Sequence, residues 1–242
     1  MIDFPQVYNH LIRRKQAENV ATRYTDDVKH LYHASSAGRC MKLQQYSIKP
    51  DAKQLEVDDR TSRLFRLGDL MHGDIQDAIY DWFGEGSVDG QLLIEHQVRI
   101  PKWNVRGFLD VALVTDKKIY LYDIKTCASF KWRKTFGRDS NRDKNPSVNY
   151  EMQLATYATA LMEEFSGREL EMALVWYNKD NSDMREMPVS NEFLDKADMY
   201  WNDVNGQKDC DLLPGIDADV PVQAWECRYC NFIEQCGGVP KA

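Results

Sequence analysis

Residues 106–127 read RGFLDVALVTDKKIYLYDIKTC, with two apolar runs on either side of a polar pair at 116–117. Both runs are rich in Val, Leu, Ile and Tyr, the residue types that favour β-strands. The pattern predicts an antiparallel hairpin that turns at the polar pair. A tight turn there sets a register in which Asp110 lies opposite Asp123, unless a bulge shifts the pairing.

The two facing aspartates predict a metal site. Like charges opposite each other on a ladder repel, and a divalent cation between them would turn that repulsion into binding. Mg²⁺ prefers one or two carboxylates together with waters and phosphate oxygens. Lys125 follows Asp123 by two residues, so both side chains leave the same face of the strand. Taken singly, these are ordinary polar residues at strand ends; together, within apolar runs, they favour phosphodiester hydrolysis.

Length and composition are those of a soluble globular protein. The chain has 242 residues, of which 43% are hydrophobic and 29% are charged. It contains no apolar run near the roughly 18 residues of a membrane span. The N-terminal sequence lacks the apolar core of a signal peptide, so we expect a cytoplasmic protein. In a reducing compartment the six cysteines are expected to be metal ligands or buried thiols.

The net charge of −7 argues against broad, non-specific binding to nucleic acid. Residues 130–147, FKWRKTFGRDSNRDKNPS, are the exception, with six basic residues against two acidic ones and three interleaved aromatic residues. We expect a mobile loop here, either simply solvated or touching a nucleic-acid strand. The candidate DNA-binding residues are Lys131, Arg133, Lys134, Arg138 and Arg142.

Helical periodicity begins at Thr61 and predicts a long helix on which Gly68 and His72 share one face. A glycine within a helix costs about 1 kcal/mol relative to alanine, and is tolerated best where another segment packs close to the backbone. A second helix is expected over 150–164, with Gln153 and Tyr157 on one face. Further elements are expected as strands over 92–100, 171–178 and 185–189 and a helix over 191–205, with irregular chain over 206–224.

The C-terminal region carries Cys227, Cys230 and Cys236 with the spacing C-x2-C-x5-C, a strong metal-site pattern. A four-thiolate shell needs one more ligand, and the candidates are Cys40, Cys127 and Cys210. Cys40 is preferred because Arg39 and Lys42 beside it would offset thiolate charge. Zinc and an iron–sulfur cluster both accept four cysteines. A single C-x2-C pair suits the cluster better than zinc.

The chain resembles the PD-(D/E)XK nucleases of the RecB type. The resemblance rests on Gly68-x3-His72, Gly107-x2-Asp110, Asp123-Ile124-Lys125 and Gln153-x3-Tyr157, in that order. The four cysteines resemble those of the iron–sulfur branch, which includes the fourth CRISPR-associated protein, AddB and related phage exonucleases. Each motif is weak alone, but the set extends over residues 40–236.

The resemblance implies an α/β (α+β) fold with a restriction-endonuclease-like core, in which helices flank a mixed central sheet. It divides the chain into an N-terminal helical region (1–60), a nuclease core (61–205) and an iron–sulfur segment (206–242). His72, Asp110, Asp123 and the Ile124 carbonyl are then the Mg²⁺ or Mn²⁺ ligands, and Lys125 is the catalytic lysine. Gln153 and Tyr157 assist at the active site, and Cys40, Cys227, Cys230 and Cys236 hold a [4Fe-4S] cluster.

The expected function is a metal-dependent exonuclease that acts on single-stranded or duplex DNA ends. Two alternatives are a DNA-end-binding or recombination module in which cleavage is secondary, and an endonuclease such as a CRISPR spacer-processing enzyme. DNA is the expected partner, and a recombination or CRISPR-adaptation protein is a further candidate. The intact set of two acids and a lysine favours the nuclease.

Overall fold

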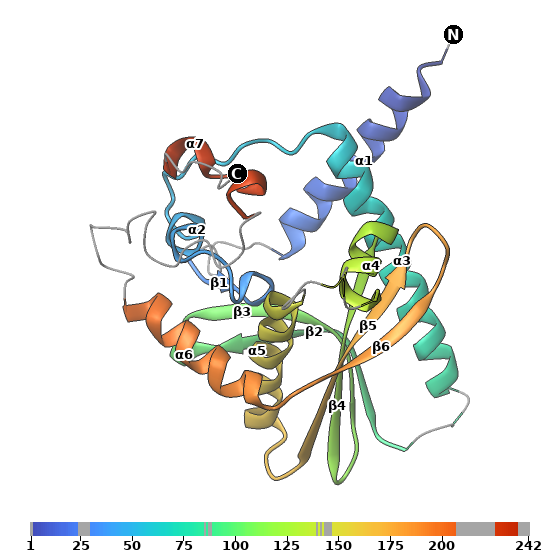
Figure 1. Ribbon diagram of the computed structural model, residues 1–242, viewed down its shortest axis with the longest axis vertical. Helices are drawn as coiled ribbons and strands as arrows, with labels where there is room; N and C mark the ends of the chain where they lie inside the picture. Colours follow the sequence, from blue (N-terminus) through green and yellow to red (C-terminus); the bar gives the residue numbers. More distant parts are fainter. Residues whose placement is uncertain are drawn as a thin grey trace.

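The computed structural model describes residues 2–23, 30–84, 86, 89–138, 140, 142, 147–206 and 226–236. Its strands form one mixed sheet with the order β1-β3-β4-β5-β6, and β2 pairs with β3 off this path (Figure 1). The pairs β1–β3 and β4–β5 are parallel, whereas β2–β3, β3–β4 and β5–β6 are antiparallel. The strands are β1 (Tyr32–His33), β2 (Gln91–Ile100), β3 (Val105–Val114), β4 (Lys118–Cys127), β5 (Glu169–Asn178) and β6 (Met184–Val189).

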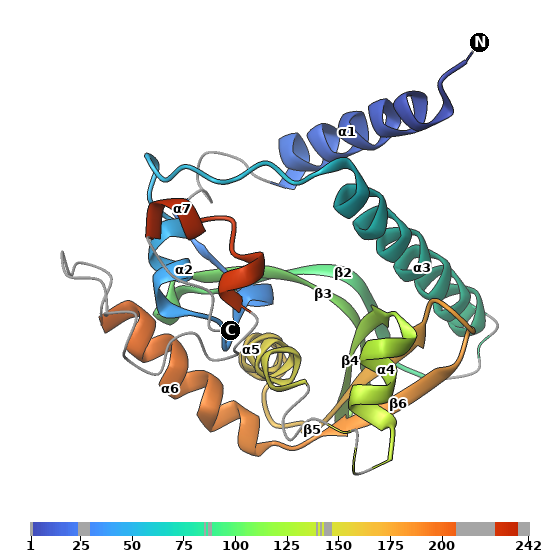
Figure 2. The same cartoon turned by 45° about the horizontal axis from the view of Figure 1, so that its top comes forward.

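Helices flank this sheet, as expected for the predicted mixed α/β fold (Figure 2). Helix α5 packs against the strands through an almost continuous buried face, and α6 lies beside α5. Helix α3 contacts β2, β3 and β4. The helices are α1 (Phe4–Arg23), α2 (Met41–Ser47), α3 (Asp59–Gly84), α4 (Ser129–Phe136), α5 (Val148–Glu164), α6 (Glu192–Gly206) and the short α7 (Ile233–Cys236).

The predicted hairpin forms with the predicted register. Pairs from Val114 with Ile119 to Val111 with Tyr122 follow it, and the turn is closed by Thr115 N–H donating to the Lys118 carbonyl over 2.8 Å. Followed from the turn, the β3–β4 ladder ends at the pair of Val111 with Tyr122. The next position along, Asp110 opposite Asp123, is not paired in the ladder. The two aspartates therefore lie just where the strands separate, which leaves their side chains room to meet other groups.

The expected loop over 130–147 is wrong in its first half, where the chain forms α4. Trp132 and Phe136 are one helical turn apart and contact each other, with ring centroids 4.8 Å apart. Phe136 also meets the buried Trp176 edge-on at 5.8 Å. These two rings pack against the sheet and are not displayed to a ligand, whereas Phe130 is 68% exposed.

The other expected elements agree with the structure to within a few residues. Of the irregular segment predicted over 206–224, only residue 206 is among the described residues. Cys210 lies outside them. Among the described residues, no helix combines the length and the apolar character that crossing a membrane requires.

Candidate active site

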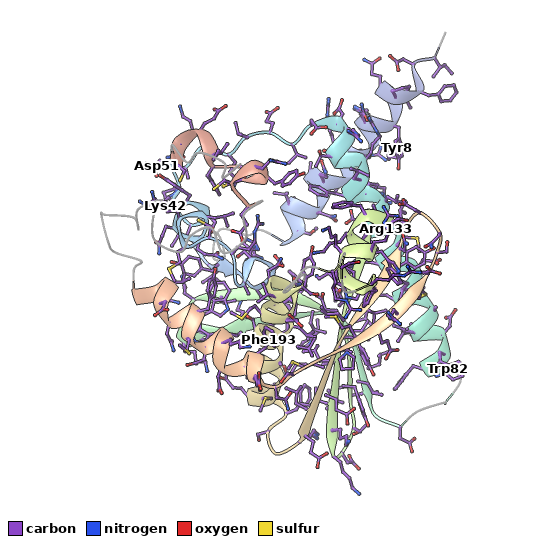
Figure 3. The ribbon with its side chains drawn as sticks, viewed as in Figure 1. Tyr8, Lys42, Asp51, Trp82, Arg133 and Phe193 are labelled. Atoms are coloured by element: carbon purple, nitrogen blue, oxygen red, sulfur yellow. The ribbon has the colours of Figure 1, made fainter. Side chains whose placement is uncertain are left out.

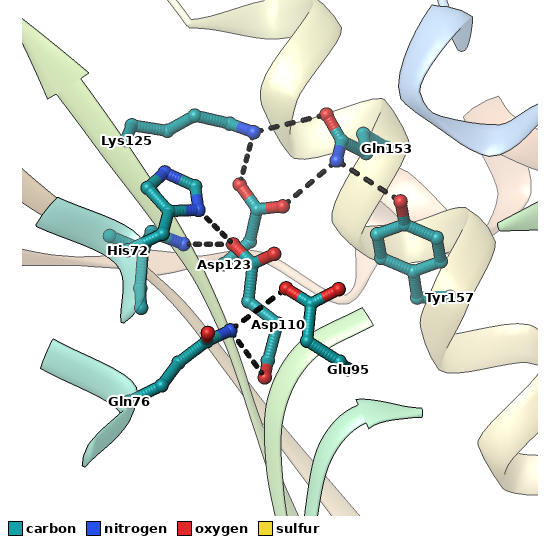
Figure 4. A network of polar contacts seen from close by, with 9 residues as sticks. His72, Gln76, Glu95, Asp110, Asp123, Lys125, Gln153 and Tyr157 are labelled. Carbon is teal, nitrogen blue, oxygen red and sulfur yellow. Dashed lines mark hydrogen bonds and ion pairs between the residues drawn. The ribbon is translucent and has the colours of Figure 1, made fainter. Parts of the chain in front are cut away.

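Polar side chains from five elements converge near Asp110 and Asp123, beyond the last ladder pair of the hairpin and away from its turn (Figure 4). A cavity of about 470 Å³ adjoins them and is lined by residues of these five elements together with Asn19 of α1, His33 of β1 and Ser35. Asp110 and Lys125 line it, whereas Asp123, which is ion-paired with Lys125, is fully buried and is not among the lining residues. The converging residues are His72 and Gln76 on α3, Glu95 on β2, Asp110 on β3, Asp123 and Lys125 on β4, and Gln153 and Tyr157 on α5.

Lys125 and Asp123 form a buried ion pair of 2.6 Å, as expected for side chains two residues apart on one strand. Gln153 is bonded to both partners: its amide oxygen accepts from the Lys125 ammonium over 3.1 Å, and its nitrogen donates to Asp123 over 2.9 Å. The same nitrogen donates to the Tyr157 hydroxyl over 3.2 Å. Helix α5 thus holds the acid and the lysine in fixed positions.

Asp110 completes the acidic pair by reaching across the gap where the ladder ends. Its Oδ2 accepts the backbone N–H of Ile124 over 2.7 Å, so the carboxylate replaces a strand carbonyl as acceptor. His72 Nδ1 lies 3.7 Å from the same oxygen. The structure therefore brings together His72, Asp110 and the residues around Asp123.

Glu95 is a site residue that the sequence did not single out. It faces Asp110 across the β2–β3 ladder, between the pairs Ile94 with Val111 and His96 with Leu109. Its backbone has a positive φ of 49°, a left-handed conformation that is uncommon for a residue other than glycine. Gln76 donates both to the Glu95 carboxylate, over 3.1 Å, and to the Asp110 carbonyl, over 3.2 Å. The signal available in the sequence was an acidic residue placed directly after the apolar run at 92–94 within a predicted strand.

Burial and charge set the protonation of the ion pair. Burial raises the pKa of Asp123 to about 6; Lys125 opposes this shift and Asp110 adds to it. For Lys125, burial disfavours the charged ammonium, but the attraction of Asp123 and Asp110 outweighs it and raises the pKa. The lysine consequently keeps its proton at neutral pH.

His72 and Tyr157 are neutral in this environment. Burial, aided by the positive charge of Lys125, lowers the pKa of His72. The imidazole is therefore available as a metal ligand at neutral pH. Burial and then the nearby Asp123 hold the pKa of Tyr157 well above its ordinary value, so this residue stays a phenol.

Two motif glycines owe their identity to close packing. A Cβ on Gly107 would lie 2.6 Å from Cε1 of Tyr157 and 3.0 Å from the Cβ of Ala34. A Cβ on Gly68 would lie 3.3 Å from the Thr126 hydroxyl oxygen, which agrees with the expected close approach at this point of α3. Gly107 thus lets the Tyr157 ring settle against β3.

The predicted metal ligands are close together but are not arranged as a shell. Within the described residues, no group of three or more His, Cys, Asp or Glu side chains has the geometry to hold an ion. The Lys125 ammonium and the Ile124 N–H instead bond to the acid oxygens. The donor set still fits Mg²⁺ or Mn²⁺, since Asp110 and Glu95 line a cavity with room for waters and phosphate, and Asp123 is the chain neighbour of the Ile124 N–H that Asp110 accepts.

The four predicted cluster cysteines line one small pocket between α2 and the C-terminal segment. Leu43, Tyr46, Phe232 and Ile233 form much of its wall, and the Tyr46 and Phe232 rings stack at 5.6 Å. Burial raises the pKa of Cys40 to about 11, and the Glu226 carboxylate accepts the Cys40 backbone N–H over 2.8 Å. Cys127 ends β4 and is not among the residues that line this pocket.

The predicted DNA-binding residues lie elsewhere. Lys131, Arg133 and Lys134 are on α4, which Figure 3 marks with Arg133, and Arg138 and Arg142 follow it. None of these five described side chains lines the active-site cavity.

The comparisons with known proteins agree with this fold. SSO0001 has a crystal structure that matches 94% of each chain with 16% identity and a TM-score of 0.55. A putative exonuclease from Eubacterium rectale matches 93% of this chain and 94% of its own, with 14% identity and a TM-score of 0.52. No curated protein sequence matches. The family model of the PD-(D/E)XK nuclease superfamily matches residues 52–237, and the chain therefore belongs to that superfamily.

Proposed function

We propose that this nuclease is a divalent-metal-dependent DNA exonuclease of the RecB-like, iron–sulfur branch, acting at single-stranded or duplex ends. The observation that carries the proposal is that Asp110 and Lys125 line one open cavity while the buried Asp123 is ion-paired with Lys125. The name of the Eubacterium rectale neighbour, a putative exonuclease, points the same way.

In this proposal Asp110, Asp123 and His72, with the Ile124 carbonyl, hold Mg²⁺ or Mn²⁺. When bound, the ion would supply Lewis acidity toward the phosphate and lower the pKa of a bound water. Glu95 faces the same space and adds negative charge behind Asp110. Because burial raises the pKa of Asp123 to about 6, metal and proton would compete for this carboxylate in the acid range.

Lys125 is the residue proposed to act on the reacting phosphate. Its raised pKa keeps the ammonium charged, which suits it to offset developing negative charge or to position water. Gln153 orients the ammonium through the 3.1 Å hydrogen bond, and Tyr157 supports Gln153 from the buried side. Gln153 and Tyr157 are therefore proposed as positioning residues.

We further propose that Cys40, Cys227, Cys230 and Cys236 hold a [4Fe-4S] cluster. The shared pocket and its apolar wall support this ligand set. The Phe232 N–H already donates to the Cys230 sulfur over 3.4 Å. Two further bonds anchor the tail: Leu55 N–H donates to the Asn231 carbonyl over 2.8 Å and Lys53 N–H to the Gln235 side chain over 2.9 Å. The cluster would lock the 206–242 segment onto the 1–60 region.

The basic residues of α4 and its continuation are proposed to contact DNA away from the cavity. Cations on phosphates give affinity without sequence information. Substituting Arg133 or Lys134 by glutamine is then expected to lower DNA affinity and to reduce the salt dependence of binding by about 0.7–1 per residue.

The function is tested by nuclease assays with Mg²⁺ or Mn²⁺ on linear and circular DNA. The Lys125→Ala and Asp123→Ala proteins are expected to lose at least about a hundredfold in rate. Lys117→Ala, which removes an exposed lysine from the turn of the same hairpin, is the matched control and should cleave as the parent does. Wild-type rates in the two site variants would refute the proposal.

The substrate form decides between the alternatives. An exonuclease degrades linear DNA and spares covalently closed circles, whereas cutting of circles would indicate an endonuclease. Tight DNA binding without metal-dependent cleavage would indicate an end-binding module.

A further inference from the structure

The four cysteines of the proposed cluster site come from two distant parts of the chain. Cys40 immediately precedes α2, whereas the other three belong to the C-terminal segment, which contains the short 3-10 helix η5 (Glu226–Tyr229) and α7. The two parts lie side by side in the fold (Figure 2). A four-thiolate site therefore needs a connection that brings three ligands to the fourth.

The Cys40 side of the site is anchored on the core. The Tyr200 hydroxyl of α6 donates to the Arg39 carbonyl over 2.7 Å. Gly38 has a positive φ of 70° and lies so close to α5 that a Cβ there would be 3.1 Å from Met152 Cγ. The position of Cys40 is therefore set by the helices that cover the sheet.

The C-terminal segment is held by a few separate contacts. Within the described residues, neither η5 nor α7 packs broadly against a helix or strand. The stacked ring of Phe232 and hydrogen bonds at Asn231 and Gln235 hold its later part. Its beginning is held at Glu226, whose Oε2 accepts the Cys40 N–H over 2.8 Å across a separation of 186 residues.

Glu226 lies in an unusual place for a carboxylate. It is 1% exposed, and burying a charge is costly unless the charge is compensated. Thiolates in a metal-bound site beside it would also repel it. Its hydrogen bond from the Cys40 N–H is charge-assisted, and such bonds are roughly twice as strong as neutral ones. The connection to Cys40 explains the position, because it places the next residue, Cys227, beside that ligand.

We propose that Glu226 is a positioning residue that joins Cys227 to Cys40 and so assembles the four-cysteine site before any metal binds. The inference rests on the proposed cluster and deepens it, because it assigns the residue that brings the two groups of ligands together. A site that is already assembled loses less conformational entropy on binding. It therefore takes up iron more readily and releases it more slowly.

Two substitutions separate the hydrogen bond from the charge. Glu226→Gln keeps an oxygen that can accept the Cys40 N–H but removes the charge, whereas Glu226→Ala removes both. Glu234→Ala is the matched control, since it removes an exposed carboxylate from α7 in the same segment.

Two rates are measured for each protein. Iron-loaded protein, purified anaerobically, is mixed with an excess of an iron chelator, and the loss of absorbance near roughly 400 nm gives the rate of iron release. In reduced, metal-free protein, hydrogen exchange of the Cys40 amide reports whether its bond to residue 226 is present. The buried amides of α5 report in the same experiment that the fold is intact.

Glu226→Ala is expected to release iron about tenfold faster than wild type, or to be purified without iron, and its Cys40 amide should exchange about tenfold faster. Glu226→Gln should stay within about threefold of wild type in both rates, because its amide oxygen still accepts the Cys40 N–H. Glu234→Ala should match wild type. Equal rates in wild type and Glu226→Ala, or a Glu226→Gln protein as fast as Glu226→Ala, would overturn the proposal.

Failure of the two proposals is distinguishable. A wild-type protein without iron, whose Cys40 amide loses protection in Glu226→Ala, would overturn the cluster and leave the role of Glu226 standing. An iron-loaded protein in which neither rate responds to Glu226→Ala would overturn that role alone. Metal-dependent cleavage is tested separately, by the Asp123 and Lys125 variants.

Discussion

Replacing Gly107 by alanine tests whether the motif glycine exists to admit Tyr157. The new Cβ would lie 2.6 Å from Tyr157 Cε1 and 3.0 Å from the Cβ of Ala34. Carbon atoms prefer about 3.5–4.0 Å, so the overlap with the ring is about 1 Å. Neither neighbour can yield easily, because Tyr157 is 3% and Ala34 0% exposed.

Overpacking of this kind costs about 1–3 kcal/mol of the free energy of unfolding. For a chain of this length that lowers Tm by roughly 2–12 °C. The displaced ring also pulls on Gln153, which orients Lys125 and Asp123, so kcat should fall by more than stability alone explains.

Gly73→Ala is the matched control, since Gly73 lines the same cavity but a Cβ there has no neighbour within 4 Å. As a helical position it should gain up to about 1 kcal/mol with alanine. Denaturant unfolding of both metal-free variants measures whether each substitution lowers or raises the free energy of unfolding. A Gly107→Ala protein as stable as the parent, with unchanged kcat, would refute the packing argument.

Three further outcomes are expected. At limiting Mg²⁺ the rate should rise from pH 5 to pH 7, because the raised pKa of Asp123, about 6, leaves it protonated and unable to bind metal below that pH; a flat profile over this range would contradict the assignment. Tyr157→Phe should lower kcat severalfold while changing stability by no more than about 1.5 kcal/mol, as kinetics and denaturation of the same sample can show. Cys40→Ser should abolish the broad absorbance near roughly 400 nm of anaerobically purified protein, whereas Cys127→Ser should keep it. A colourless wild-type protein that contains stoichiometric zinc would show that zinc, and not an iron–sulfur cluster, occupies the site.

The arrangement of the site explains why the acids need support from several elements. Asp123 is fully buried and carries a charge that water cannot solvate. Lys125 and Gln153 supply the compensating charge and hydrogen bond. Asp110 is held separately by the Ile124 backbone.

The α4 segment shows where local sequence misleads. Its charges and the later glycine and proline predict a loop, yet Trp132 and Phe136 are spaced to share one face of a helix. That face becomes favourable only because Trp176 of β5 offers an apolar partner. The partner lies forty residues away in sequence.

The sequence by itself determined the hairpin, its register and the placing of Asp110, Asp123 and Lys125, because turn position and the two-residue alternation of a strand are local properties. Only the tertiary structure brought Glu95 opposite Asp110, pressed Tyr157 against Gly107, and set His33 beside Arg106. Those contacts join segments far apart in the chain. Their geometry follows from how the whole sheet and its helices pack, and no spacing within one segment encodes it.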